Sequence, residues 1–304
     1  MDLLSYVITS DLEKLKKNLC FGDINQTDEN KNSLLMRAIY QANLEIARLL
    51  VLNGANLNLK NKDGNTALHI AILKNNLALV KLLIRNKALI ELKNNELETP
   101  LMLALRLGYK TSYELLLEFE PVLTNKNKRG ESLGAYLIYA NDLNLFKKNA
   151  LKYDLLNERD YFNNTLLHLA VKLHRDDFTK VLLQLGLLPN VLNSNNETPL
   201  FFAAYTNNFK SASFLMHQMA LLTFKNKDGF TIFDIASIRF MSYLEALENS
   251  YFYQRYLREF PLHVAVCERN KKNIAKYKTI INQNKKDDFD HLASFYANYY
   301  GIII

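Results

Sequence analysis

A hydroxyl side chain recurs in this chain every 33 residues, and the series runs through seven members without a shift. A fixed period of about 20 to 50 residues is typical of proteins that stack one supersecondary unit many times. Such units contact only their neighbours and share a continuous core. The period therefore predicts one stacked array rather than two globular domains. The members of the series are Ser33, Thr66, Thr99, Ser132, Thr165, Thr198 and Thr231.

Each unit is expected to contain two short helices. A Ser or Thr oxygen at a helix start can accept a hydrogen bond from a free backbone N–H. Pro100 and Pro199 follow in the first turn, where a missing N–H costs nothing. A second, more apolar helix follows, as in residues 77–84, and neither helix is long enough to be stable alone. The first helix should end at residues that tolerate the left-handed conformation, which are Asn75, Gly108, Asn141 and Asn207.

The text around the hydroxyl residues also repeats. Residues 65–71 read Asn-Thr-Ala-Leu-His-Ile-Ala, residues 164–170 read Asn-Thr-Leu-Leu-His-Leu-Ala, and Glu-Thr-Pro-Leu occurs at 98–101 and 197–200. This pattern resembles the Gly-x-Thr-Pro-Leu-His-x-Ala signature of the ankyrin-repeat family, over roughly residues 1–285. The resemblance implies an all-α solenoid of helix–loop–helix units with finger loops, whose motif histidines at 69, 168 and 263 have structural roles.

The positions of the repeated residues define the boundaries of the cap and of the repeats. An N-terminal cap is expected at residues 1–27, with a second helix that Asp11 opens. Complete repeats begin near residues 28, 61, 94, 127, 160, 193 and 226. A shortened repeat follows near 255–286, because Pro261 lies four residues closer to Thr231 than the period requires, which is expected to shorten the preceding finger. The solenoid thus spans 1–286, and residues 287–304 are expected to form a C-terminal capping segment.

The repeat that begins near residue 127 departs from the pattern. Gly134 and Ala135 stand where neighbouring repeats have Leu and a larger side chain. Less apolar area should therefore be buried there, at a cost of roughly 0.8 kcal/mol for each missing buried methylene. We expect this repeat to open locally faster than the repeat before it.

Composition excludes several classes of protein. The chain is 49% hydrophobic and 23% charged, which is typical of a folded chain, and its 9 Gly and 5 Pro are too few for a β-sandwich of 304 residues. No apolar run approaches about 18 residues, so membrane insertion is not expected. Cys20 and Cys267 lie far apart, which favours free thiols in a reducing, cytoplasmic compartment. The 36 Asn residues indicate an AT-rich genome, and with a eukaryote-like repeat they suggest a bacterial effector delivered into a host cell.

The sequence contains no motif that would carry catalysis. Phosphate-binding loops, zinc-protease helices and nucleophile elbows do not occur in it. His263 and Cys267 would share a helix face, but no further ligand stands at a metal-binding spacing. We therefore expect no catalytic residue, no cofactor and no metal, and the chain is not expected to be an enzyme.

The family resemblance implies a binding face made by the finger tips and the exposed side of each first helix. Tyr and Arg are enriched at interface hot spots, and exposed cations can steer an acidic partner. The alternative is that the charged tips only confer solubility and that the tyrosines pack only on neighbouring repeats. The first-helix candidates are Tyr40, Arg106, Tyr139, Lys172 and Tyr205, and the finger candidates are Lys62, Lys128, Arg129, Tyr161, Phe162 and Phe230.

The leading hypothesis is a non-enzymatic scaffold that binds a protein with an acidic surface. One alternative is a nucleic-acid-binding module that uses the basic finger edge, although most fingers lack stacking aromatics and nucleic acid is not the expected partner. Another is an accessory array for an enzyme on a different chain. The apolar C-terminus is expected to fold back as a cap, which predicts a monomer, or else to dock on a partner or on a second copy.

Overall fold

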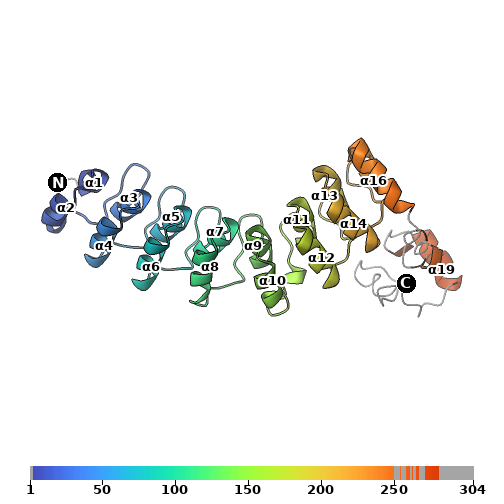
Figure 1. Ribbon diagram of the computed structural model, residues 1–304, viewed down its shortest axis with the longest axis horizontal. Helices are drawn as coiled ribbons and strands as arrows, with labels where there is room; N and C mark the ends of the chain where they lie inside the picture. Colours follow the sequence, from blue (N-terminus) through green and yellow to red (C-terminus); the bar gives the residue numbers. More distant parts are fainter. Residues whose placement is uncertain are drawn as a thin grey trace. The chain divides into compact units, whose positions relative to one another are not determined.

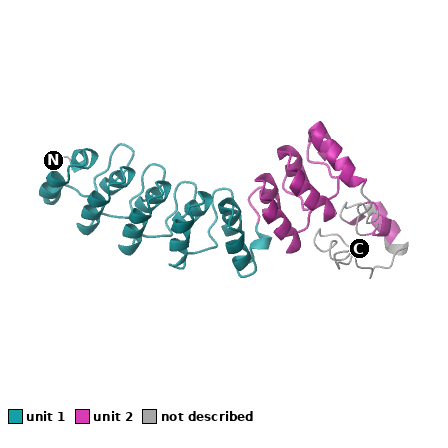
Figure 2. Cartoon of the chain, viewed as in Figure 1, with its two compact units in different colours: residues 1–158 teal, residues 159–304 magenta. Residues whose placement is uncertain are grey.

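The computed structural model describes residues 3–249, 254, 258–260, 262, 265, 266 and 271–280. The chain divides into two compact units, residues 1–158 and residues 159–304 (Figure 2). Each unit is built of short helix pairs (Figure 1). In the described residues, β pairing is limited to two isolated bridges, Thr27 with Ser33 and Arg159 with Thr165. The expected all-α repeat architecture is confirmed.

Unit 1 begins with a capping pair and continues with four repeats. As predicted, Asp11 caps the second helix of the capping pair and accepts from the N–H of Lys14 at 3.0 Å. The last helix pair is followed by a short 3₁₀ turn. The elements are α1 (Leu3–Ile8), α2 (Leu12–Asn18), η1 (Leu19–Phe21), α3 (Leu34–Tyr40), α4 (Leu44–Leu52), α5 (Ala67–Leu73), α6 (Leu77–Arg85), α7 (Pro100–Arg106), α8 (Lys110–Leu117), α9 (Leu133–Ala140), α10 (Leu143–Asn149) and η2 (Leu155–Asn157).

Unit 2 continues the same plan through three further helix pairs. Its described elements are α11 (Leu166–Lys172), α12 (Asp176–Gln184), α13 (Pro199–Thr206), α14 (Phe209–His217), α15 (Ile232–Ile235), α16 (Ile238–Glu248) and α19 (Lys271–Ile280). The last of these lies in the segment near 255–286, where a shortened repeat was expected.

The predicted helix boundaries are confirmed. All seven residues of the hydroxyl series are N-cap residues of a first helix. Asn75, Gly108, Asn141 and Asn207 all have positive φ, as the closing of a helix requires. Ala42 and His174 occupy the same repeat position and have the same conformation, although neither is Gly or Asn.

Stacking supplies the core within each unit. In α5, residues 67–72 are all buried, because α3 and α7 flank this helix and α6 covers it. Second helices are amphipathic by comparison, and α6 buries Leu79, Val80, Leu83 and Ile84. Each large apolar side chain buried in this way stabilises the fold by roughly 1.5–3 kcal/mol.

The repeat near residue 127 regains part of its missing volume. Tyr136 stands where other repeats have Ile70 or Leu103, and its side chain is fully buried. The apolar area that Gly134 and Ala135 lack is thus partly supplied by this ring. Faster local opening of the repeat stays a prediction.

The seventh repeat is shortened in its first helix, α15, rather than in the finger that follows the repeat, where the sequence analysis placed the deletion. The second helices of the earlier repeats start 33 residues apart, and the last of them, α14, starts at Phe209. The period therefore places the next start at residue 242, but α16 begins four residues earlier, at Ile238. Ala236 is extended, with φ −75° and ψ 148°, and Ser237 caps α16 by accepting from Phe240 N–H at 3.3 Å. Part of the expected finger near 249–261, His263 with Cys267, and the segment 287–304 lie outside the described residues.

Candidate partner-binding face

Backbone hydrogen bonds join the tips of neighbouring fingers inside each unit. Each bond runs from a tip N–H to a carbonyl in the preceding finger, at 2.8–3.0 Å. Side chains at the tips therefore project from a fixed backbone. The pairs are Lys62 to Asn30, Asn95 to Asp63 and Lys128 to Glu96 in unit 1, and Ser194 to Phe162 and Lys227 to Asn195 in unit 2.

The fingers of unit 1 carry an excess of positive charge. Residues 60–63, 93–96 and 126–129 include six Lys or Arg side chains and only two acidic ones. Lys60, Lys93 and Lys126 share one repeat position, and we call these three the basic row. Lys60 Nζ donates to the backbone oxygen of Lys93 at 2.6 Å, which joins the first two members of the row. No aromatic residue occurs in these twelve positions.

The finger candidates lie where the sequence placed them, at the exposed tips. Lys62, Lys128, Arg129, Tyr161, Phe162 and Phe230 are all exposed. Lys128 Nζ lies 3.5 Å from Glu96 Oε1, an exposed ion pair of the kind that contributes little to stability. In unit 2, Asp160 Oδ1 accepts from the N–H of Phe162 at 3.0 Å and fixes the turn that presents the two aromatic rings.

The sequence analysis missed a set of buried carboxylates at one repeat position. Glu98, Glu131 and Glu197 immediately precede a hydroxyl N-cap, and their residues are 8% exposed or less. Each accepts from the amide of an Asn four residues earlier. Each also accepts from an Arg or Tyr eight residues later. The sequence signal that could have identified them is a Glu directly before the N-cap residue, followed eight residues later by an Arg or Tyr.

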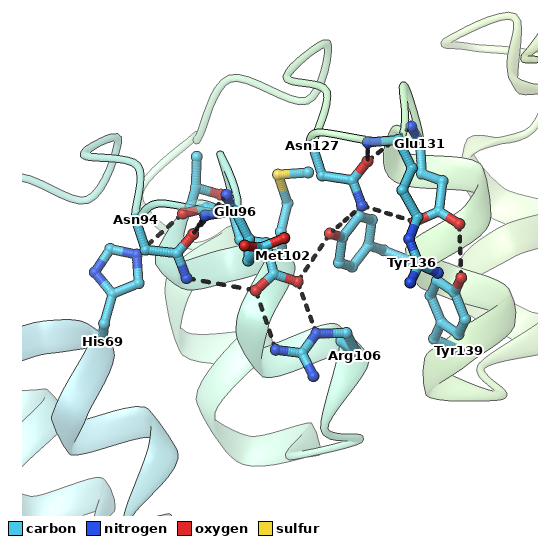
Figure 3. Close-up of polar contacts among 12 residues, drawn as sticks. His69, Asn94, Glu96, Met102, Arg106, Asn127, Glu131, Tyr136 and Tyr139 are labelled. Atoms are coloured by element: carbon cyan, nitrogen blue, oxygen red, sulfur yellow. Dashed lines mark hydrogen bonds and ion pairs between the residues drawn. The ribbon is translucent and has the colours of Figure 1, made fainter. Parts of the chain in front are cut away.

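Glu98 lies at the centre of the largest of these networks. Figure 3 labels its donors Asn94, Arg106 and Tyr136. Arg106 donates to both carboxylate oxygens, at 2.7 Å from Nε to Oε1 and 3.0 Å from Nη2 to Oε2. The hydroxyl of Tyr136 donates to Oε1 at 2.9 Å. Burial raises the pKa of Glu98, but the hydrogen bonds and charge of Arg106, with the Tyr136 bond, outweigh it and leave that pKa lowered. Arg106 therefore neutralises a buried charge of its own repeat.

Tyr139 and Tyr205 make the equivalent contacts in their repeats. The Tyr139 hydroxyl donates to Glu131 Oε1 at 2.7 Å, and the Tyr205 hydroxyl donates to Glu197 Oε1 at 2.7 Å. Burial and the Glu197 carboxylate raise the pKa of Tyr205 to about 12. The polar ends of both tyrosines are thus used inside the repeat, while the ring of Tyr205 remains exposed.

Tyr40 and Lys172 complete the first-helix candidates. Tyr40 is half-buried, and Lys74 Nζ lies 5.5 Å from its ring centroid. Lys172 is the last residue of α11 and is exposed. The candidates on the first helices therefore combine internal contacts with the surface positions that were predicted for them.

The motif histidines connect successive repeats. In His69, Nδ1 accepts from Thr66 N–H at 3.3 Å, so Nε2 carries the proton and donates to Glu98 O at 3.1 Å. His168 repeats both contacts with Thr165 and Glu197. Burial lowers the pKa of both rings to about 4, which keeps them neutral. Their structural role is confirmed.

Two searches of the described part of the chain gave negative findings. No three His, Cys, Asp or Glu side chains there gather closely enough to hold a metal ion. Its helices are also too short or too polar for any of them to span a bilayer.

Comparison with known proteins identifies the repeat. A family model described as ankyrin repeats (3 copies) matches residues 4–94, 35–129 and 135–228. Among solved structures, the chain is similar to the ankyrin repeat domain of Bcl-3, described as a unique member of the IkappaB protein family. That match has a TM-score of 0.57 at 20% identity and covers 71% of this chain and 97% of that one. No curated protein sequence matches the chain.

Proposed function

Because the chain belongs to the ankyrin-repeat family, whose repeats generally mediate protein–protein interaction, we propose that it is a non-enzymatic module that binds another protein. The partner contacts the finger edge and the exposed side of the first helices. The observation that carries this proposal is the basic row of unit 1, held on fingers that backbone hydrogen bonds fix in place.

The charge of this edge favours an acidic partner surface. These twelve finger positions hold six cations and only two acids, Asp63 and Glu96, so a negatively charged protein would be attracted and oriented before contact. The absence of aromatic side chains from these fingers argues against single-stranded nucleic acid, whose bases stack on such rings. An exposed free thiol at Cys20 supports a reducing compartment, and the Asn-rich composition supports delivery into a host cytoplasm.

The test reverses the charge of the basic row. The full chain with Lys60→Glu, Lys93→Glu and Lys126→Glu is compared with wild type for binding of a fluorescent poly-glutamate peptide, by anisotropy at low and high salt. We expect roughly tenfold weaker binding, mainly through slower association, as is usual for exposed rim charges.

The matched control makes the same change of net charge within unit 1. Its substitutions are Lys81→Glu, Lys110→Glu and Lys147→Glu, exposed positions on the second helices. Equal weakening by the control, or no weakening by the row variant, would rule out the basic row as the contact. Tighter binding of a single-stranded oligonucleotide than of the peptide would favour the nucleic-acid alternative.

A further inference from the structure

The shortened helix of the seventh repeat changes the inner surface of unit 2. The first helices α3, α5, α7, α9, α11 and α13 span seven or eight residues, but α15 spans four. Ile238, at the repeat position of Tyr205, consequently leaves the row of first helices and begins α16. Ile238 is 79% exposed.

Three exposed apolar side chains come from segments that hydrogen bonds hold together, and we call them the Tyr205 cluster: Tyr205, Phe230 and Ile238. Ser237 Oγ donates to Asn207 Oδ1 at 2.6 Å, which ties the start of α16 to the end of α13. Asn226 Oδ1 accepts from Phe230 N–H at 3.0 Å and fixes the finger that carries Phe230. Lys227 N–H of that finger donates to Asn195 O at 2.9 Å, in the finger where Glu197 accepts from the Tyr205 hydroxyl.

The cluster is a site where apolar surface is left uncovered. Tyr205 is 47% exposed and Phe230 is 51% exposed. Phe230 occupies the repeat position at which Glu98, Glu131 and Glu197 are buried, so an aromatic ring replaces a paired carboxylate there. Exposed apolar side chains with charged neighbours are typical of interaction sites.

The charges around the cluster indicate what would cover it. Lys172, at Tyr205's position one repeat earlier, and Lys227, in the finger of Phe230, are exposed. Arg239 follows Ile238, with its guanidinium 5.3 Å from the Phe209 ring centroid. The nearby Asp234 carboxylate is already occupied by the Thr231 N–H and hydroxyl at 2.7 Å. Asp228, in the finger of Phe230, is exposed as well.

We propose that the Tyr205 cluster anchors a protein segment in which a bulky apolar side chain is flanked by carboxylates. The apolar side chain covers Ile238, Phe230 and the ring of Tyr205, and the carboxylates meet Lys172, Lys227 and Arg239. This inference rests on the proposed function in that the ligand is a protein, but it concerns unit 2 and does not require the basic row.

The experiment uses three short synthetic peptides and the full chain. The first peptide has a central Phe between Glu residues, the second has Ala in place of Phe, and the third has Lys in place of Glu. We expect the first peptide to bind at least tenfold more tightly than either of the others. The Phe230→Ser, Ile238→Ser variant should lose the preference for Phe over Ala, while Tyr205→Phe, which keeps the ring, should retain it.

Leu151→Ser is the matched control, since Leu151 is 78% exposed and lies in unit 1. Circular dichroism verifies that each variant is folded. Equal binding of the Phe and Ala peptides, equal binding of the Lys peptide, or an equal effect of Leu151→Ser would overturn the anchor. The Lys60→Glu, Lys93→Glu, Lys126→Glu variant tests the basic row, and the difference in affinity between the Phe and Ala peptides tests the cluster, so each proposal can fail separately.

Discussion

The hydroxyl of Tyr205 donates a 2.7 Å hydrogen bond to Oε1 of Glu197, a carboxylate that is almost fully buried between repeats. The ring of the same tyrosine is exposed to solvent. One side chain therefore satisfies an internal acceptor through its polar end and offers an apolar surface through its ring. Stability and binding can be separated at this residue, because Phe removes the first property and keeps the second.

Tyr205→Phe and Tyr139→Phe should each lower the free energy of unfolding by about 1–3 kcal/mol, the usual cost of leaving a buried acceptor without its donor. Glu197 and Glu131 would then keep only their Asn donors. Tyr40→Phe is the control, because residue 32, at the matching position of its repeat, is Asn. Urea unfolding followed by circular dichroism measures the three variants, and equal losses in all of them would contradict the role of the carboxylates.

Removal of the Arg106 guanidinium should lower the free energy of unfolding further. In Arg106→Met, Glu98 loses both charged hydrogen bonds while it remains buried, so we expect a loss of about 2 kcal/mol or more, reduced from the fully buried case because Arg106 is partly exposed. Lys at this position supplies the charge but not the planar pair of donors, and should restore the stability only in part.

Lys128→Met provides the comparison for that prediction. Lys128 also pairs with a glutamate, Glu96, but both side chains are exposed. Its removal should change the free energy of unfolding by less than about 1 kcal/mol. Thermal unfolding of the two variants side by side distinguishes the cases, and a similar shift for both would show that Glu98 does not depend on Arg106.

The fold follows from local patterns, whereas much of the site does not. The 33-residue period and the capping chemistry of Ser and Thr were sufficient to place the start of each first helix from α3 to α15. The pairing of Glu98 with Arg106, eight residues later, depends on which side chains α7 brings together once it has formed, and no local pattern of the sequence shows this. The early start of α16 results from Ser237, a local cap that overrides the period, and periodicity alone predicted a start at residue 242.

Acid should destabilise both units through their buried histidines. His69 and His168 have pKa values lowered to about 4, against an ordinary value of 6.5. The unfolded chain binds more protons between these values, so stability is lost as pH falls from 6.5 towards 4. Each ring contributes no more than about 3 kcal/mol by this linkage. Melting temperatures at pH 7 and pH 5 should differ less in His69→Asn than in wild type, and the exposed His174→Gln should behave as wild type.

Glu158 should have the opposite effect on the pH dependence of stability. Its Oε2 accepts from Gly134 N–H at 2.9 Å at the start of α9, where the Ser132 hydroxyl does not cap its own helix. Burial raises the pKa of Glu158 to about 7, although hydrogen bonds from Ser132 and Gly134 and the charge of Lys126 lower it. The folded state therefore holds the proton more tightly than the unfolded state. Stability from this group is lost as pH rises from 4.5 to about 7, and is constant above that.

Glu158→Gln keeps an oxygen that can accept from Gly134 N–H but removes the titration. Amide-exchange protection of residues 133–140, corrected for the intrinsic pH dependence of exchange, should fall between pH 5 and pH 7.5 in wild type and stay nearly level in this variant. Glu118→Gln, an exposed substitution on the preceding repeat, should follow wild type. A variant that kept the full pH dependence would show that another group titrates at this helix start, because Gln has no proton to lose in that range.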